Sequence, residues 1–314
     1  MENHTAMLTD LSATVRTKHL YDFLLSLKGK GILSGQQECP CDKTHGDELA
    51  HIKECSGHLP AILGLDYIEH DYEGVNKRAR EWFDRGGIVS ICWHWGIPPY
   101  GVGYPSSQES VDMVELLTPG TPLYEGLLSN LDVVANALKE LQDADIPVLF
   151  RPLHEFDGAW FWWGKGGSEN FKKLWIMMYD RYTNYWGLDN LIWVLGYSGN
   201  GNGYADWYPG DAYVDIAGAD SYNDGSNAAL YNKVKDVVGE ERPICFHECG
   251  RIPTVDQLTA THADWVWFMT WHTEHITDHN DTDTLNEIYN DDYVITLDEL
   301  PDLYNTKENP AAEK

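Results

Sequence analysis

Two glutamates each end a short apolar run of the sequence: Glu155 follows residues 148–154, and Glu248 follows residues 243–247. A pair of carboxyl groups can divide the work of a displacement reaction, because a protonated one donates to a leaving oxygen while an ionised one attacks carbon. Most glutamates are solvated surface charges. A glutamate that ends an apolar run beside His and Trp residues is more typical of a functional site, so we predict Glu155 and Glu248 as the catalytic pair.

Aromatic residues supply a second signal. The chain of 314 residues contains 13 Trp and 18 Tyr, and its tryptophans cluster at residues 93–95, 160–163 and 265–271. Any single aromatic residue belongs to a core more often than to a site. Sugar rings, however, stack their C–H faces on aromatic rings and need fixed hydrogen-bond partners for their hydroxyls. The clusters lie beside His, Asp, Asn and Glu residues, and together they indicate a carbohydrate-binding groove.

Eight short apolar runs, largely non-alternating and rich in Val and Ile, predict strands that are buried on both faces. They are residues 31–34, 61–65, 88–93, 148–151, 191–195, 214–217, 244–247 and 265–269. Residues 17–27, 71–84, 131–141 and 168–182 predict helices, with Ser168 as the N-cap of the last. Alternating strands and helices imply parallel pairing. Eight strands therefore predict an α/β fold, a single (β/α)8 TIM barrel over residues 1–314 with a frayed tail at 305–314.

The predicted barrel brings the two glutamates together. In a TIM barrel the active site lies at the C-terminal ends of the strands. Glu155 and Glu248 end the fourth and seventh predicted strands, which face each other across the barrel mouth. Carboxyl groups roughly 5–5.5 Å apart would there cleave a glycosidic bond with retention, through a covalent intermediate. No Gly-x-Gly-x-x-Gly sequence follows the first predicted strand, which argues against a dinucleotide-binding fold.

Charge and cysteine content exclude several classes of partner. The formal net charge of −28 argues against binding to nucleic acid or to an anionic membrane. No apolar run approaches the roughly 20 residues of a membrane span, and residues 1–16 lack the apolar segment of a signal peptide. The cysteines form no paired C-x-x-C set, so we expect no structural zinc. We expect buried thiols at Cys92 and Cys245, while a Cys39–Cys55 or Cys41–Cys55 disulfide stays open.

The sequence RPLHEFDGAWFWWG at residues 151–164 resembles the acid/base signature of glycoside hydrolase family 26, the β-mannanase family of clan A. The resemblance continues at residues 93–98, 191–194, 215–222 and 247–250, so it covers nearly the whole chain. It implies a retaining endo-β-1,4-mannanase with Glu155 as general acid/base and Glu248 as nucleophile. The implied substrates are mannan, glucomannan and galactomannan, and we expect no cofactor and no metal.

The same resemblance implies a set of residues around the glutamates. Tyr222 would orient Glu248, His94 would contact the sugar at the −1 subsite, and His154 would lie beside the acid/base where most clan members have Asn. The full set of substrate-binding candidates is His94, Trp95, His154, Trp160, Trp163, Tyr222 and Trp271. Supporting roles at the barrel mouth fall to Arg151, Asp66, Asp157, Asp220 and His247, with Asp66 and Asp220 as structural hydrogen-bonding residues.

Three further positions depart from the family pattern. Phe246 and His247 precede Glu248, where the family more often has a small or hydroxyl residue and then Thr. We interpret His247 as a partner of Glu248 rather than a core histidine. Asp157 stands where Asn is common. A negative charge there would raise the pKa of Glu155 and favour the protonated form that a general acid needs.

Several alternatives stay open from the sequence. A β-1,3-1,4-glucanase, a β-1,3-xylanase or an exo-acting mannobiohydrolase would share the resemblance and differ in the loops at residues 106–128 and 197–209. A non-catalytic carbohydrate-binding barrel would need neither glutamate. A metal-dependent hydrolase is less favoured, since the 13 His include no H-E-x-x-H motif. A polysaccharide substrate implies a secreted protein, and we expect a monomer.

Overall fold

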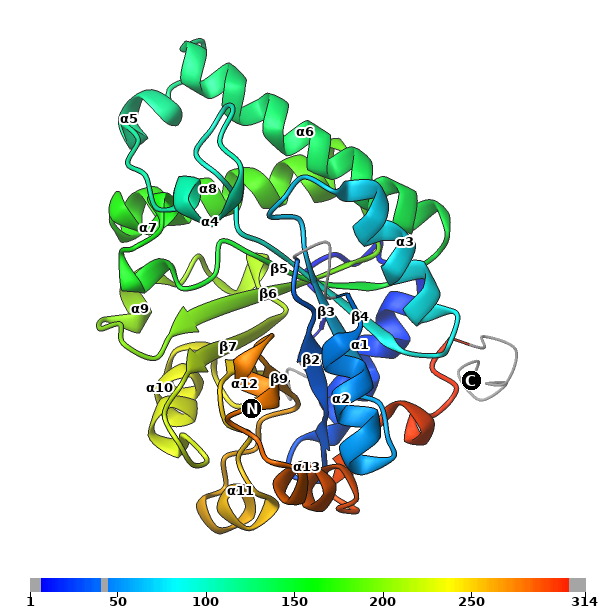
Figure 1. Ribbon diagram of the computed structural model, residues 1–314. Coiled ribbons are helices and arrows are strands. Elements are labelled where there is room, and N and C mark those ends of the chain that lie inside the picture. Colours follow the sequence, from blue (N-terminus) through cyan, green and yellow to red (C-terminus); the bar gives the residue numbers. More distant parts are fainter. Residues whose placement is uncertain (1–6, 41–44, 305–314) are drawn as a thin grey trace, which may run out of the picture.

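The computed structural model describes residues 7–40 and 45–304, and its centre is a closed barrel of eight parallel strands surrounded by helices (Figure 1). The predicted TIM barrel is therefore confirmed. In order around the barrel, the strands are β2 (Gly35–Gln37), β3 (Ile62–Asp66), β4 (Ile88–Trp93), β5 (Val148–Pro152), β6 (Leu191–Ser198), β7 (Ile216–Ser221), β8 (Ile244–Cys249) and β9 (Phe268–Thr270).

The first predicted strand is misplaced. The apolar run at residues 31–34 forms β1 (Ile32–Leu33), which pairs in parallel with β10 (Val294–Ile295) in a separate two-stranded sheet. The barrel strand is the next segment, β2, whose Gln36 and Gln37 are buried although they are polar. Gln36 Nε2 donates to the carbonyl oxygen of Gln37 at 2.8 Å, which lets a polar side chain stay inside. A polar strand of this kind gives no apolar signal.

Helices fill the connections between the barrel strands. The longer ones are α1 (Val15–Leu27), α2 (Asp47–Ser56), α3 (Tyr72–Phe83), α6 (Pro122–Asp143), α8 (Ser168–Tyr179), α10 (Ala228–Val238), α11 (Val255–Thr261) and α13 (Thr282–Tyr289). Short helices are α4 (Gly103–Ser107), α5 (Met113–Leu116), α7 (Trp162–Lys165), α9 (Tyr204–Trp207) and α12 (Glu274–Thr277). Single turns lie at η1 (Phe156–Gly158), η3 (Asp211–Tyr213) and η4 (Leu297–Glu299), and η2 (Asp180–Tyr185) is a π-helix that continues α8.

The predicted helix at 168–182 corresponds to α8 and η2, but its N-cap is not Ser168. Gly167 occupies that position with a φ of 80°, and Ser168 is the first helical residue. A positive φ is accessible to glycine at little cost, which explains why the boundary lies one residue earlier than the Ser side chain indicates. The helix predicted at residues 71–84 does begin as expected, because Asp71 Oδ1 accepts a hydrogen bond from Gly74 N at 3.0 Å.

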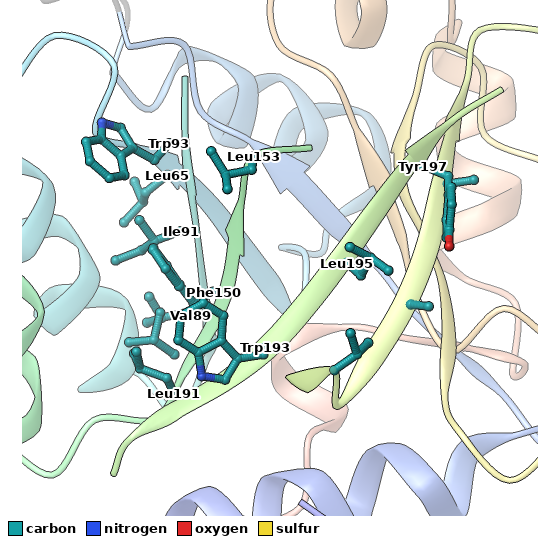
Figure 2. Close-up of a cluster of buried hydrophobic side chains, with 14 of the residues drawn as sticks. Leu65, Val89, Ile91, Trp93, Phe150, Leu153, Leu191, Trp193, Leu195 and Tyr197 are labelled. Carbon is teal, nitrogen blue, oxygen red and sulfur yellow. The ribbon is translucent and has the colours of Figure 1, made fainter. Parts of the chain in front are cut away.

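The core consists of two layers on either side of the strand walls. Alternate residues of a strand point to opposite faces. Figure 2 shows one set, in which Val89, Ile91 and Trp93 of β4 lie near Phe150 and Trp193 of the next two strands. This set clusters with apolar residues of the outer helices, such as those of α6, and forms the layer between barrel and helices. The opposite set fills the barrel interior.

Helix α1 covers the end of the barrel where the strands begin. Its residues Leu20, Leu24 and Leu27 cluster with the interior set of strand residues. Hydrogen bonds place it there, since Thr14 N donates to the carbonyl oxygen of Asp189 just before β6, and Tyr21 Oη donates to that of Asp215 just before β7. With this end closed, only the C-terminal ends of the strands are left to form a site. No helix within the described ranges is both long enough and apolar enough to serve as a membrane span.

The cysteine expectations are met in part. Cys92 and Cys245 are buried free thiols, as predicted. Cys55 also carries a free thiol, whose Sγ lies 3.7 Å from His51 Nε2 and 3.6 Å from Thr282 Oγ1, so the Cys39–Cys55 disulfide is not formed. Cys41 and the tail at 305–314 lie outside the described residues.

Candidate active site

A cavity of about 560 Å³ opens at the C-terminal ends of the barrel strands, and both predicted catalytic glutamates line it. Aromatic and charged side chains from the ends of most strands surround them. The lining residues are Pro40, Asp66, Ile68, Glu69, His94, Tyr104, Glu155, Trp160, Phe161, Asn200, Tyr222, Glu248, Trp271 and His272. This mixture of aromatic faces and a few polar groups is suited to a ligand with apolar faces and hydroxyl edges.

The barrel places Glu155 and Glu248 close together. Glu248 lies within β8, and Glu155 lies three residues beyond the end of β5 in a turn where its φ is 52°. Glu155 N donates to the carbonyl oxygen of Gly196 in β6 at 2.7 Å, which fixes that turn against the barrel wall. Carboxylate oxygens of Glu155, Asp220 and Glu248 all lie within 4.8 Å of one another. This short separation leaves no room for a water molecule between two carboxyl groups and a sugar, as inversion would require.

Glu248 accepts hydrogen bonds from two side chains, Arg151 and Tyr222. Arg151 in β5 donates from Nη1 and Nη2 to Glu248 Oε2, at 3.3 and 3.2 Å, and Tyr222 Oη donates to Oε1 at 2.5 Å. Arg151 is 3% exposed, so this charge pair is shielded from water and from salt. Three donors on two oxygens also fix the orientation of the carboxylate, which is what a nucleophile aimed at one carbon needs.

The environment of Glu155 favours the protonated form. Burial and the nearby Glu248 carboxylate together raise the pKa of Glu155 to about 7. A smaller effect in the opposite direction comes from Trp160 Nε1, which donates a hydrogen bond to Glu155 Oε2 at 3.0 Å and lowers that pKa. Trp160 can approach because Gly158 has no side chain: a Cβ there would lie 2.1 Å from the indole ring. Glu155 thus has the raised pKa that an acid role requires, while Glu248 is the carboxyl group paired with Arg151.

The expected cause of the raised pKa was wrong. Asp157, which the sequence placed as a charge acting on Glu155, instead accepts a hydrogen bond from Ser198 N on its Oδ1 at 2.7 Å and does not line the cavity. The carboxylate that raises the pKa of Glu155 is Glu248. Asp157 ties the Glu155 turn to the end of β6, close to Asn200, which does line the cavity.

Asp157→Asn is expected to make stability less dependent on pH. Burial raises the pKa of Asp157 from 3.8 to about 6, so the folded state favours the neutral carboxyl group. The stability that the neutral Asp157 carboxyl group contributes to the folded state is fully present below pH 3.8 and is lost as the pH rises through 6. Relative to the wild type, the Asn variant should therefore gain about 1–3 kcal/mol in free energy of unfolding between pH 4 and pH 8. Urea unfolding at both pH values measures it. Asp206→Asn, at an exposed position, is the control, and a pH-independent difference would contradict the assignment.

His94 is held by a chain of buried polar groups. Its Nδ1 lies 2.5 Å from Asp66 Oδ2, and its Nε2 lies 3.0 Å from His154 Nε2. Burial opposes a charge on His94, but the Asp66 carboxylate outweighs it, and the pKa of His94 is raised. Burial and the neighbouring His94 lower the pKa of His154 well below its usual value, so that ring stays neutral. Asp66 and His94 line the cavity as expected.

Three predicted substrate-binding residues lie behind the cavity surface. His154 is fully buried, and its partner His94 stands between it and the cavity. Trp163 is fully buried and donates from Nε1 to the His154 carbonyl oxygen at 2.8 Å. Trp95 is 1% exposed, stacks on Trp93 and donates to Asn130 Oδ1 at 3.2 Å. The expectation that these three side chains contact substrate is corrected: His154 and Trp163 pack against Phe161, and Trp95 packs against Trp93 and Trp162 in the core. Trp160, Trp271 and Tyr222 do line the cavity.

The cavity also contains residues that the sequence did not single out. Tyr104 and Glu69 follow β4 and β3, Asn200 follows β6, and His272 directly follows Trp271. Asn200 lies in the loop 197–209 that the sequence marked as relevant to specificity. For Tyr104, Glu69 and His272, the signal that the sequence offered was their position after a predicted strand. His247, in contrast, is buried beneath the site. Its Nδ1 accepts a hydrogen bond from Arg151 Nη1 at 3.0 Å and contacts Asp220. His247 is therefore connected to Glu248 through Arg151 and does not contact it directly.

A closed (β/α)8 barrel with two adjacent carboxyl groups, one with a raised pKa and one paired with an arginine, among aromatic side chains is the architecture of a glycoside hydrolase. Comparison with known proteins narrows this class. The model of glycosyl hydrolase family 26 matches residues 9–299, and the chain belongs to that family.

Relatives in sequence and structure are mannanases. The chain is 36% identical over 93% of its length to a mannan endo-1,4-β-mannosidase of Thermothelomyces thermophilus, and 35% identical over 90% to mannan endo-1,4-β-mannosidase B of Piromyces sp.. It covers 63% and 52% of those proteins, so it spans about half to under two thirds of their length. A ruminal endo-β-1,4-mannanase structure superposes with a TM-score of 0.88 at 32% identity, covering 94% of this chain and 70% of that one. A β-mannanase from a symbiotic protist of the termite Reticulitermes speratus, complexed with gluco-manno-oligosaccharide, gives 0.87 at 30% identity, covering 94% and 98%.

Proposed function

We propose that this chain is a retaining endo-β-1,4-mannanase that hydrolyses mannan, glucomannan or galactomannan by double displacement. The observation that carries the proposal is the pair Glu155 and Glu248, whose oxygens lie within 4.8 Å, with a raised pKa for Glu155 and an Arg151 hydrogen bond on Glu248. The relatives named above act on mannan or were crystallised with a gluco-manno-oligosaccharide, which supports the substrate class. A polymeric substrate cannot enter a cell, so we also propose that the protein acts outside it, as a monomer.

In the first step, Glu155 donates its proton to the leaving glycosidic oxygen while a Glu248 oxygen attacks the anomeric carbon. The aglycone leaves as an alcohol, and the sugar stays bound to Glu248 as an ester. Glu155, now a carboxylate, then removes a proton from water, which attacks the anomeric carbon and releases Glu248. Tyr222 and Arg151 hold Glu248 in line, and Trp160 steadies Glu155 through its 3.0 Å hydrogen bond.

Side-by-side assays on mannan, lichenan and β-1,3-xylan test this function. We expect reducing ends to appear on mannan and a ladder of internal-cleavage products from mannohexaose. Proton NMR of the first products should show the β-anomer, since two displacements restore the original configuration. Activity on lichenan alone, or α-anomeric first products, would sink the proposal.

A further inference from the structure

Asp220 is a buried carboxyl group with no obvious counter-charge of its own. It lies in β7, directly opposite Glu248 in the strand register, and is 1% exposed. Within the described part of the chain, neither of its oxygens receives a hydrogen bond of acceptable geometry. The nearest cation, Arg151 Nη1, is 3.8 Å from Oδ2, whereas Arg151 makes two hydrogen bonds to Glu248. An ionised carboxylate in such a place would be costly.

The charges at the barrel mouth cannot all be balanced if Asp220 is ionised. Three carboxyl groups, Glu155, Asp220 and Glu248, lie within 4.8 Å of one another, and one guanidinium, that of Arg151, faces them. The guanidinium forms its ion pair with Glu248, because its contact with Glu248 is shorter than its contact with Asp220. Like charges at this separation disfavour ionisation of the others. Protons on both Glu155 and Asp220 leave a single ion pair, Arg151 with Glu248.

The contact with His247 gives an independent reason for a proton on Asp220. A guanidinium can only donate, so Arg151 Nη1, at 3.0 Å, makes His247 Nδ1 an acceptor without a hydrogen. The same Nδ1 contacts Asp220 Oδ1. The Nδ1 lone pair is repelled more strongly by an ionised oxygen than by the carbonyl oxygen of a neutral carboxyl group, whose proton is then on Oδ2. Burial and Arg151 lower the pKa of His247, which excludes an imidazolium as the alternative.

We infer that Asp220 is a neutral carboxylic acid that positions Glu155: its O–H donates a hydrogen bond to Glu155 when Glu155 becomes the carboxylate base, and it adds no negative charge beside the nucleophile. The role given to Glu155 in this inference rests on the proposed function. The presence of a proton on Asp220 does not depend on that function. Burial, followed by Glu248, raises the pKa of Asp220, in agreement with the geometry. The side chain is a positioning residue, since Glu155 and not Asp220 lines the cavity.

The other titratable groups around Asp220 supply no second cation. Tyr222 follows it at the end of β7 and donates to Glu248. Tyr204, Cys245 and Cys249 are neutral because burial raises the pKa of each. Arg151, His247 and the two glutamates complete the surroundings of Asp220, and His94, which is paired with Asp66, acts on Glu155. A pH response that involves Asp220 therefore depends on these carboxyl groups, on Arg151 and on His94.

The pH dependence of kcat/KM in Asp220→Asn and Asp220→Ala tests the inference. Asn keeps a neutral donor, so we expect it to retain roughly a tenth or more of the activity and to leave the alkaline limb set by Glu155 in place. Ala removes the donor and should lower kcat on the order of 100-fold. If Asp220 were ionised, Asn would remove a nearby negative charge and move the alkaline limb down by about one pH unit or more. That shift, or equal losses in both variants, would overturn the inference. Asp157→Asn is the matched control, and we expect it to leave the limb in place.

A measurement on the wild-type protein keeps the test independent of folding and of activity. Carboxyl carbon-13 NMR of aspartate-labelled protein, with the Asp220 signal assigned by its loss in Asp220→Asn, should show a protonated carboxyl group from pH 5 to pH 8. An Asp220 signal that reports an ionised group at pH 7 contradicts the inference even if the protein hydrolyses mannan. If mannan is not hydrolysed at all, the proposed function fails while this signal still reports on Asp220.

Discussion

Glu248→Ala is expected to abolish hydrolysis of every substrate, with kcat lower by on the order of 10⁴-fold or more. The reason is that Glu248 is the carboxylate oriented by Arg151 and Tyr222, whereas Glu155 is protonated up to about pH 7 and the Asp66 carboxylate is held by His94. Without a nucleophile, the covalent intermediate cannot form. Reducing-sugar release from mannan measures the loss. Mass spectrometry of enzyme quenched during turnover should show a glycosyl adduct in the wild type and none in the variant.

Removal of Glu248 also leaves the Arg151 guanidinium buried without its partner, so stability must be measured beside activity. The matched control is Glu241→Ala, an exposed glutamate just before β8, which should not change kcat. A Glu248→Ala protein that unfolds at the wild-type temperature yet keeps more than about a hundredth of the activity would show that the nucleophile lies elsewhere.

Glu155→Ala should give a loss that depends on the leaving group. On mannan, where the departing sugar hydroxyl needs a proton, we expect kcat to fall by about 10²–10⁴-fold. An aryl mannobioside with an acidic phenol leaves without help, so its first step should be far less affected. The intermediate would then accumulate, because no base activates water. Azide needs no base, so it should restore turnover and give a mannobiosyl azide product.

The pH dependence of activity tests the same role of Glu155. The pKa of Glu155 is raised from 4.5 to about 7, so the acid form required on mannan is present below pH 7 and is lost as the pH rises through 7. The wild type should therefore lose activity above pH 7, and the Ala variant should lack this alkaline limb on the aryl substrate. Glu169→Ala, an exposed glutamate of α8, is the control. If the Glu155→Ala variant kept the alkaline limb of the pH profile, Glu155 would not be the acid/base.

The sequence was most informative where chemistry and burial coincide. Glu155 and Glu248 end apolar strands, and that pattern places them at one end of a barrel without knowledge of any distance. The pattern was silent on β2, because its residues Gln36 and Gln37 are polar although they are buried. A strand whose interior is polar looks like a loop in sequence.

Within the motif at residues 151–164, neighbours in sequence separate in space for a physical reason. Leu153, Glu155 and Ala159 all adopt positive φ values, so the chain after β5 reverses direction repeatedly. Trp160 is thereby carried to the cavity and Trp163 into the core, although both belong to one aromatic cluster. Side-chain type predicts that such residues matter, but only the path of the backbone decides which of them meets a ligand.

The pairing of β1 with β10 has a consequence for the order in which the molecule can assemble. Ile32 lies opposite Val294, and in the barrel Gln36 of β2 lies opposite Thr270 of β9. Each seam joins residues more than 200 positions apart in sequence, so the barrel cannot close during synthesis until Thr270 has left the ribosome, nor can β1 pair until Val294 has. Contacts between residues so distant in sequence slow folding. Until the barrel closes, the strands from β2 to β8 can form only an open sheet, and the unpaired edges of such a sheet can associate with other chains.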